Sequence, residues 1–248
     1  MLSKAQIKYI HALQHKKYRQ KFGQFIAEGD KIVLEIVLTQ PQLVTAVYAT
    51  TQWLSQHSTA IHQYPAAQLH EVTETELKSI SSLTTPNQAI ALVNMPARSE
   101  NIELANRVTI AVETLQDPGN LGTIIRIADW FGVAQVICSP GSVDPYNAKT
   151  IQATMGSYAR IPVLEADLAA LFQTNTSIPV YAATLHGQNI TLFDPIKEGV
   201  ILIGNESKGL SDDLLQYCTH QITIPRIGHA ESLNAAVATG IICGRLLL

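Results

Sequence analysis

Three segments in the second half of the chain contain the side chains that could do chemistry. They read "LQDPGNLGTIIRIADWFGV", "ILIGNESKGLS" and "ITIPRIGHAESLNAAVATG". Each joins an apolar run to a loop with glycine and polar residues. Amide, guanidinium, carboxylate and hydroxyl groups can bind and orient a ligand, and carboxylates can also accept a proton. The candidate positions are Asn120, Arg126, Glu206, Ser232 and Asn234.

Loops that bind phosphates match the first segment poorly. A dinucleotide loop needs G-x-G-x-x-G and an acidic residue about 20 positions later, but the segment offers only Gly119 and Gly122, with no acid in the later "SPGS". A P-loop would need Lys and then Ser or Thr after its last glycine, whereas Gly122 is followed by Thr123 and Ile124. A nucleotide-dependent oxidoreductase therefore lacks its fingerprint.

A plain structural role stays open for each loop by itself. Gly119 could supply a positive φ in a strand-to-helix turn, and Asn120 could cap the helix that follows. Glu206 could be a surface acid, Ser232 a helix N-cap and Asn234 a polar residue of a first helical turn. The occurrence of three such loops, each at the end of an apolar run, favours a shared site.

The elements that would position these loops follow a regular order from residue 108 onward. Apolar runs typical of buried strands alternate with helical patterns, and the runs are "VTIAVETL", "AQVICSP", "RIPVLE", "PVYAATL", "GVILIGNE" and "HQITIPR". Such alternation indicates an α/β fold with a mostly parallel sheet covered on both faces. Ligands of these sheets bind at the carboxyl ends of the strands, where the three loops would meet.

The front of the chain predicts a separate, smaller α/β domain over residues 1–95. Its first 20 residues are typical of helix, and "KFGQFIAEGDKIVLEIVLT" predicts a short strand, a turn at Gly29 and a helix. Further strands are expected at "LVTAVYAT" and "AIALVNM", with the helical sequence "AAQLHEVTETELKSISS" between them. The polar stretch at 96–107 predicts a linker, and residues 108–248 form the second domain.

Composition and cysteine usage limit the class of protein. The 248 residues have a net charge of -3, and no apolar run reaches the roughly 18 to 20 residues of a membrane span. Cys138, Cys218 and Cys243 are odd in number and lack metal spacing, which predicts a reduced, cytoplasmic protein. His11 and His15 stand four apart without a third ligand, so no metal is expected.

The N-terminal segment is basic although the whole chain is acidic. Residues 1–31 hold seven Lys or Arg against two acids. Tyr18 stands among four cations that are close in sequence, and it could stack on a base. We expect an RNA-docking surface, with a solvated helix face as the alternative. Its cations are Lys16, Lys17, Arg19 and Lys21.

The three polar segments, taken in order, resemble the motifs of the SpoU, or TrmH, group of SPOUT RNA 2'-O-ribose methyltransferases. The front segment "KKYRQKFGQFIAEGDKIVLEIV" resembles, more loosely, the substrate-binding domain of that group. The resemblance implies a trefoil knot near the C-terminus, a homodimer, and S-adenosylmethionine as the methyl donor. It favours ribosomal RNA as the substrate, with transfer RNA as the second choice. A non-catalytic RNA-binding or ribosome assembly factor with the same fold is a further alternative.

The resemblance also assigns positions. The reaction site of the group would fall on Asn120, Arg126, Glu206, Ser232 and Asn234. Its cofactor site would fall on Thr184, Leu185, Gly204, Asn205, Ile224 and Leu233, mainly through backbone groups.

Arg126 and Arg226 could each contact a phosphate of the RNA. A guanidinium stays protonated in proteins, so we expect Arg126 to clamp the phosphate beside the target ribose rather than to act as a base, with a solvated helix arginine as the plain alternative. Arg226 stands where the group more often has Met, and it is either a phosphate contact or an exposed charge.

Overall fold

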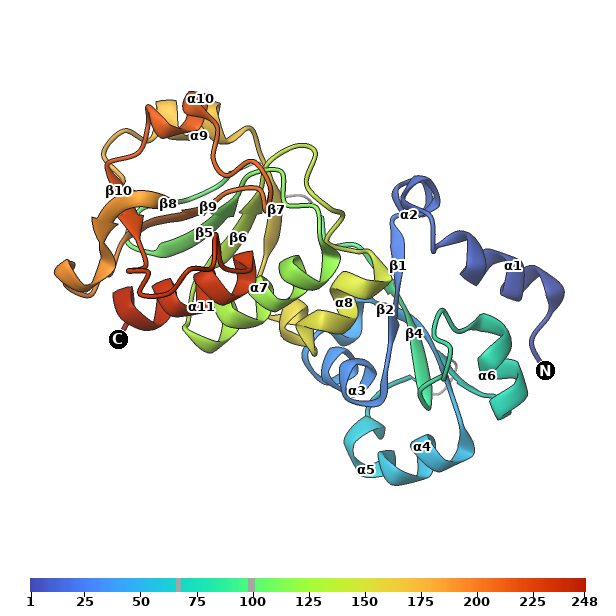
Figure 1. Ribbon diagram of the computed structural model, residues 1–248. Coiled ribbons are helices and arrows are strands. Elements are labelled where there is room, and N and C mark those ends of the chain that lie inside the picture. Colours follow the sequence, from blue (N-terminus) through green and yellow to red (C-terminus); the bar gives the residue numbers. More distant parts are fainter. Residues whose placement is uncertain (66–67, 98–100) are drawn as a thin grey trace. The chain divides into compact units, whose positions relative to one another are not determined.

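The computed structural model describes residues 1–65, 68–97 and 101–248, and it divides into two compact units. Unit 1 comprises Met1–Ala97 together with Asp144–Arg160, and unit 2 comprises Arg98–Val143 together with Ile161–Leu248. The chain therefore leaves unit 2 after Val143 and returns to it at Ile161 (Figure 1).

Unit 1 is built on a mixed four-stranded sheet with the strand order β1-β4-β2-β3. Strand β4 pairs antiparallel with both β1 and β2, and β2 pairs parallel with β3. The strands are β1 (Gln24–Glu28), β2 (Val44–Ala49), β3 (Leu69–Glu71) and β4 (Ala89–Asn94). The helices are α1 (Lys4–Ala12), α2 (Lys16–Phe22), α3 (Asp30–Thr39), α4 (Thr51–Gln56), α5 (Ser58–Ile61), α6 (Glu74–Ile80) and α8 (Ala148–Thr154), with 3₁₀ turns η1 (Pro41–Leu43) and η3 (Ser157–Ala159).

The alternation of side chains along these strands gives unit 1 two apolar layers. On one face, Phe25 and Val47 belong to a cluster with residues of α3 and α4. On the other face, Ile26 and Ile90 belong to a cluster with residues of α1 and α6. The predicted strand, turn and helix around Gly29 are confirmed, and Gly29 has the positive φ of 130° that glycine adopts readily.

Helix α8 differs from the expected domain boundaries, because the sequence placed it in the second domain. Its Ile151 is buried in the same cluster as Phe25, and Ala159 of the following turn is buried there too. The Gln40 side chain also donates a hydrogen bond to the carbonyl of Ala159. Segment 144–160 is therefore part of the core of unit 1.

Unit 2 is built on a six-stranded sheet with the order β10-β8-β9-β5-β6-β7, and all of its pairings are parallel. This confirms the expected parallel α/β fold. The strands are β5 (Val108–Val112), β6 (Gln135–Cys138), β7 (Val163–Glu165), β8 (Val180–Asn189), β9 (Gly199–Ile203) and β10 (His220–Thr223). The helices are α7 (Pro118–Trp130), α9 (Leu168–Thr174), α10 (Asp212–Leu215) and α11 (Ala235–Leu246), with the 3₁₀ turn η4 (Ile190–Leu192).

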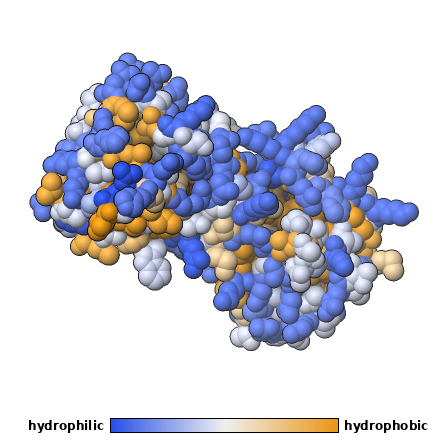
Figure 2. Space-filling model, in the orientation of Figure 1, coloured by the Kyte–Doolittle hydropathy of each residue, from blue (hydrophilic) through white to orange (hydrophobic). Residues whose placement is uncertain are grey.

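Helices α7 and α11 lie side by side in unit 2 (Figure 1). Gly240 and Gly244 of α11 face α7, because a Cβ at Gly240 would make an ordinary contact of 3.6 Å with Cδ1 of Ile127, and one at Gly244 would lie 3.7 Å from the ring of Phe131. The outer side of α11 is apolar as well. Val237 and Ile241 are 52% and 41% exposed, and Figure 2 shows hydrophobic residues gathered where α11 lies.

Other predictions require correction. The predicted linker 96–107 lies partly outside the described residues, at 98–100, and Leu104 is buried in the core of unit 2 rather than in a linker. The stretch 66–82 was predicted as helical, but it contains strand β3, and α6 covers only its second half; residues 66–67 lie outside the described part of the chain. Within the described part of the chain, no helix is both long enough and apolar enough to cross a membrane.

Candidate active site

Three of the predicted polar residues meet in one hydrogen-bonded chain in unit 2. The side-chain amide of Asn234 donates to Oδ1 of Asn120 at 2.7 Å. The amide of Asn120 in turn donates to Oε1 of Glu206 at 3.2 Å. These residues are separated by 86 and 114 positions in sequence, so the fold alone brings them together. The expected convergence at the ends of the strands therefore holds for Asn120, Glu206 and Asn234.

The first turn of α7 positions Asn120. Asp117 is the N-cap, and its Oδ1 accepts the backbone N–H of Asn120 at 2.7 Å. Pro118 occupies the first helical position, which requires no N–H donor. The plain alternative for this loop is wrong in detail, because Asp117 rather than Asn120 caps the helix and Gly119 does not have a positive φ. The side chain of Asn120 is consequently free to turn into the site.

A tight turn after β9 positions Glu206. Asn205 and Gly209 exchange backbone hydrogen bonds of 3.0 and 2.9 Å, and Gly209 has a φ of 71°. The Asn205 side chain donates to the carbonyl of Thr114 at 2.7 Å, which ties the turn to the end of β5. A Cβ at Gly204 would lie 2.5 Å from the carbonyl carbon of Gly209. Close approach by its own loop therefore requires glycine at 204.

Asn234 is the N-cap of α11, in the place where Ser232 was a candidate. Its Oδ1 accepts the backbone N–H groups of Ala236 and Val237 at 2.9 and 3.2 Å. Because this oxygen faces the helix, the amide nitrogen is the group that remains to reach Asn120. The order of donors thus runs from the helix cap through Asn120 to the carboxylate, which fixes the orientation of both amides.

The carboxylate of Glu206 ends this chain and is held in its charged form. Partial burial raises the pKa of Glu206, but four sets of hydrogen-bond donors together outweigh it, and the pKa lies below the ordinary 4.5. The donors are its own backbone N–H, the Asn120 amide, and the backbone N–H groups of Asp117 and Gln116. A carboxylate stabilised in this way is a weak base, so it is suited to orienting groups rather than to taking a proton.

Two predicted reaction-site residues do not join this chain in the described structure. Arg126 is exposed on α7, and no hydrogen bond or ion pair links it to Asn120, Glu206 or Asn234 among the described residues. Six positions along a helix correspond to about 240° of rotation, so Arg126 and Asn120 leave α7 in different directions. Ser232 is exposed in the loop before α11.

Three of the predicted cofactor positions, Thr184, Leu185 and Ile224, lie where β8 and β10 lose their register, whereas Gly204 and Asn205 follow β9 and Leu233 precedes α11. The ladder passes from Gln221 paired with Ala182 to Ile222 paired with Gln188, so Thr184 and Leu185 lie in the unpaired stretch between them. The hydroxyl of Thr223 donates to the carbonyl of Leu185 at 3.3 Å, and Ile224 follows directly. Residues far apart in sequence therefore supply one patch of irregular backbone.

The comparisons with known proteins give this site a family. Residues 107–244 match the model of the SpoU rRNA Methylase family, which is more than half of the chain. The chain belongs to the SpoU rRNA methylase family. Residues 4–91 match the model of the MRM3-like substrate binding domain.

Relatives are similar over nearly the whole chain. A 23S rRNA (guanosine(2553)-2'-O)-methyltransferase, RlmP of Bacillus subtilis, is 32% identical over 93% of this chain and 91% of its own. A putative RNA methyltransferase of the TrmH family from Porphyromonas gingivalis has a TM-score of 0.87 and 34% identity, over 99% of this chain and 98% of its own. An AdoMet-bound rRNA methyltransferase from Sinorhizobium meliloti has a TM-score of 0.85 and 29% identity, over 99% and 95%.

The methyl donor of this family fits the residues at the β8–β10 gap. The side-chain oxygen of Thr184 is buried and has no hydrogen-bond partner among the described residues, which leaves it for a ligand. Leu185 and Leu233 are 66% and 49% exposed, and they offer apolar surface to a nucleoside ring. No group of three or more His, Cys, Asp or Glu side chains able to hold a metal occurs in the described part of the chain.

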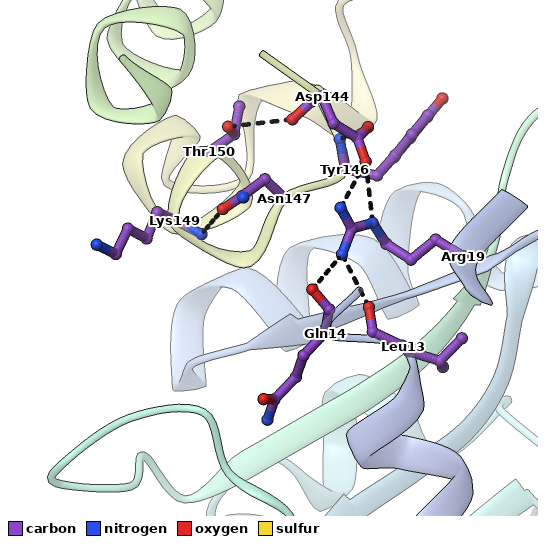
Figure 3. Close-up of polar contacts among 8 residues, drawn as sticks. All are labelled: Leu13, Gln14, Arg19, Asp144, Tyr146, Asn147, Lys149 and Thr150. Carbon is purple, nitrogen blue, oxygen red and sulfur yellow. Dashed lines mark hydrogen bonds and ion pairs between the residues drawn. The ribbon is translucent and has the colours of Figure 1, made fainter. Parts of the chain in front are cut away.

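The N-terminal cations of this SpoU protein divide into two kinds. Lys16, Lys17 and Lys21 are exposed on α2, as an RNA-docking surface requires. Arg19 is only 2% exposed, so its assignment to that surface is wrong. Its Nε and Nη2 donate to Oδ2 of Asp144 at 3.0 and 2.6 Å, and its Nη1 donates to two backbone carbonyls near the end of α1 (Figure 3).

Proposed function

We propose that this protein transfers the methyl group of S-adenosylmethionine to a ribose 2'-hydroxyl of ribosomal RNA. The observation that carries the proposal is the hydrogen-bonded chain of Asn234, Asn120 and Glu206 in the unit that also holds the irregular β8–β10 backbone, in a member of the SpoU rRNA methylase family. The relative from Bacillus subtilis is named for methylation of a guanosine 2'-oxygen in 23S rRNA, which supports this substrate class.

The polar chain supplies alignment. S-adenosylmethionine, when bound, supplies an electrophilic methyl group on a sulfonium, so the displacement requires mainly that the attacking oxygen be held in line. Asn120 and Asn234 have their amides fixed by Glu206 and by the cap of α11. Glu206 itself stays ionised, so it continues to accept the hydrogen bond that orients Asn120. Ser232, two residues before Asn234, is exposed and contacts the ribose in this proposal.

Arg126 acts on the RNA in this account. Its guanidinium is exposed, remains charged at all working pH values, and can hold a phosphate with two parallel hydrogen bonds. The proton of the 2'-hydroxyl leaves to that phosphate or to water, because neither the guanidinium nor the Glu206 carboxylate is a competent base. The cofactor rests on Thr184, Leu185, Gly204, Asn205, Ile224 and Leu233.

The C-terminal part of unit 2 forms a trefoil knot in this proposal. Its support is the close approach of two chain segments at Gly187, where an added Cβ would lie 2.5 Å from the backbone of Gln221. Only glycine permits two backbones to pass at this distance.

The functional protein is a homodimer that works in the cytoplasm on ribosomal RNA. Its support is the set of exposed apolar side chains on α7 and α11, which are Trp130, Val237 and Ile241, together with Leu248 after the end of α11. Exposed large apolar side chains, when they gather into a patch, are typical of subunit interfaces.

Unit 1 binds the RNA substrate. Its support is the match of residues 4–91 to the MRM3-like substrate binding domain and the exposed Lys16, Lys17 and Lys21. Lysines that contact phosphates release counterions, so binding weakens as salt rises.

The proposal is tested with full-length protein, S-adenosylmethionine labelled in the methyl group, and separate pools of ribosomal RNA and transfer RNA lacking the modification. Incorporation into ribosomal RNA is the expected result. Incorporation of the label into transfer RNA alone would show that transfer RNA, rather than ribosomal RNA, is the substrate. Cofactor binding without transfer to either pool would favour a non-catalytic RNA-binding or assembly factor.

A further inference from the structure

Two aromatic rings lie side by side on the exposed face of α2. Tyr18 and Phe22 are 38% and 40% exposed, although large aromatic side chains are usually buried. They stand one helical turn apart, with ring centroids separated by 6.2 Å and planes inclined by only 14°. The two rings are therefore nearly parallel and form one exposed aromatic pair, which we call the α2 platform.

The α2 platform is supported from behind. The ring of Tyr9 packs against Phe22 with a centroid distance of 5.0 Å, and its hydroxyl donates to Oε1 of Gln24 at 2.6 Å. Gln24 in turn donates to Oδ1 of Asn94 at 2.8 Å, so the support reaches the sheet of unit 1. An aromatic surface held in this way loses little conformational entropy when a ligand binds.

Arg19 fixes the helix that carries the platform. Its guanidinium donates to the carbonyls of Leu13 and Gln14, between α1 and α2, at 2.9 and 2.8 Å. The same group is paired with Asp144, which belongs to the segment that joins unit 1 later in the chain (Figure 3). Arg19 is thus a positioning residue for α2, and it leaves contact with phosphates to the lysines.

The surroundings of the α2 platform are positive. Residues 1–27 contain no Asp or Glu, and five of their cations are exposed lysines. Nζ of Lys21 lies 5.5 Å from the centre of the Phe22 ring. The lysines therefore favour a polyanion as the ligand, and the exposed aromatic rings favour one that also has flat apolar groups such as bases. The exposed lysines are Lys4, Lys8, Lys16, Lys17 and Lys21.

We propose that the α2 platform binds an unpaired stretch of RNA, with a base stacked on Tyr18 and Phe22 and adjacent phosphates on Lys16, Lys17 and Lys21. This inference rests on RNA being the substrate and specifies its form. Bases inside a duplex have both faces covered by their neighbours, so only an unpaired base can stack on a protein ring. The platform distinguishes single strands from duplexes without reading sequence.

The test uses full-length protein and two oligoribonucleotides that carry 2-aminopurine, one single-stranded and one a perfect duplex of equal length. The fluorescence of 2-aminopurine falls when the base stacks. The parent protein should quench the single strand and bind it more tightly than the duplex. Tyr18→Leu combined with Phe22→Leu keeps helix-forming residues on α2, and it should abolish the quenching and weaken single-strand binding by about tenfold or more.

A matched variant separates stacking from charge. Lys16→Ala combined with Lys17→Ala should reduce the salt dependence of binding while the remaining complex still quenches 2-aminopurine. The leucine pair should show the opposite pattern, with the salt dependence unchanged. Circular dichroism and the thermal midpoint of each variant show whether unit 1 stays folded.

The inference is overturned if the leucine pair binds and quenches as the parent does, or if parent and variant bind strand and duplex equally. Either result would leave α2 as a charged surface or as a contact for another protein. None of these readings requires methyl transfer. Normal stacking with no transfer to any RNA would therefore refute the proposed function and leave the platform intact.

Discussion

The side chains at the centre of the site are ordered by hydrogen bonds whose direction follows from their chemistry. Asn234 must turn its oxygen to α11, Asn120 must then accept from Asn234, and Glu206 receives the amide that remains. The sequence could predict that these residues meet, because they follow strands and precede helices. It could not predict this order, since the sequence offered Ser232 as the cap and Asn234 as a residue of the first helical turn, whereas Asn234 is the cap of α11.

Glu206→Gln tests the charged end of this chain. A carboxyl whose pKa is lowered in the folded protein stabilises it above the unfolded pKa, and that contribution is lost as the pH falls through the folded value. The parent should therefore lose thermal stability below about pH 4.5, the ordinary value of the group, and Glu206→Gln should show a shallower loss. Turnover near pH 7 should fall, because an amide cannot accept every donor that the carboxylate accepts.

The matched control for this variant is Asp194→Asn, which neutralises an exposed acid of the same unit. The loss of thermal stability of this control at low pH should match that of the parent. If Glu206→Gln and the parent lost the same thermal stability at low pH, the hydrogen bonds to Glu206 would not stabilise its charge.

Substitutions at Arg126 test whether this residue clamps the RNA phosphate or is only a solvated helix residue. Arg126→Ala should leave folding and cofactor binding nearly unchanged, because the side chain has no bond to the Asn120 chain, while turnover falls by about 10² or more. Arg126→Lys keeps the charge but loses the planar pair of donors, so it should recover only part of the rate. The residual rate of Arg126→Lys should not follow the titration of the lysine between roughly pH 7 and 10.

Parent-like turnover by Arg126→Ala would make Arg126 a surface residue. A rate of Arg126→Lys that rises with the pKa of an amine would instead favour a base at this position.

At the scale of elements, the periodic patterns predicted every strand except β3 and most helices, because both depend on local sequence. The start of α7 could also have been found, since an Asp before Pro is a typical N-cap and first-turn signal. The burial of Arg19 could not, because its partner Asp144 lies 125 positions away. A run of cations predicts exposure, and only the fold identifies the cation that is paired.

Arg19→Ala should destabilise unit 1 more than any change to the neighbouring lysines. It leaves Asp144 without its partner and two carbonyls near α1 without their donor, and breaking such a buried pair costs about 3–5 kcal/mol. Urea unfolding measures the difference. Lys17→Ala, the control on the exposed face of α2, should stay within about 0.5 kcal/mol of the parent. Equal losses for both variants would contradict the anchoring role of Arg19.

At the scale of the whole molecule, the chain returns to unit 1 for the segment Asp144–Arg160. The predicted domain boundaries did not include this return. The pattern of α8 shows an apolar face but does not show which core covers it. Ile151 and Ala159 are buried with residues of α3 and β1, so a cut before residue 98 separates them from their partners.

A fragment of residues 98–248 should therefore expose segment 144–160. In limited proteolysis we expect rapid cleavage within this segment in the fragment and slow cleavage there in the full-length protein, because loss of packing opens the backbone to the protease. Equal cleavage rates in the two proteins would mean that α8 does not depend on unit 1.

The identity of the methylated atom tests the central claim most directly. After reaction with methyl-labelled S-adenosylmethionine, the RNA is digested to nucleosides and the labelled product is identified by mass spectrometry. We predict a single 2'-O-methylnucleoside from ribosomal RNA, formed by the parent and strongly reduced with Asn120→Ala, which interrupts the chain from Asn234 to Glu206. A label on a base, or an undiminished 2'-O-methyl product with Asn120→Ala, would contradict the account.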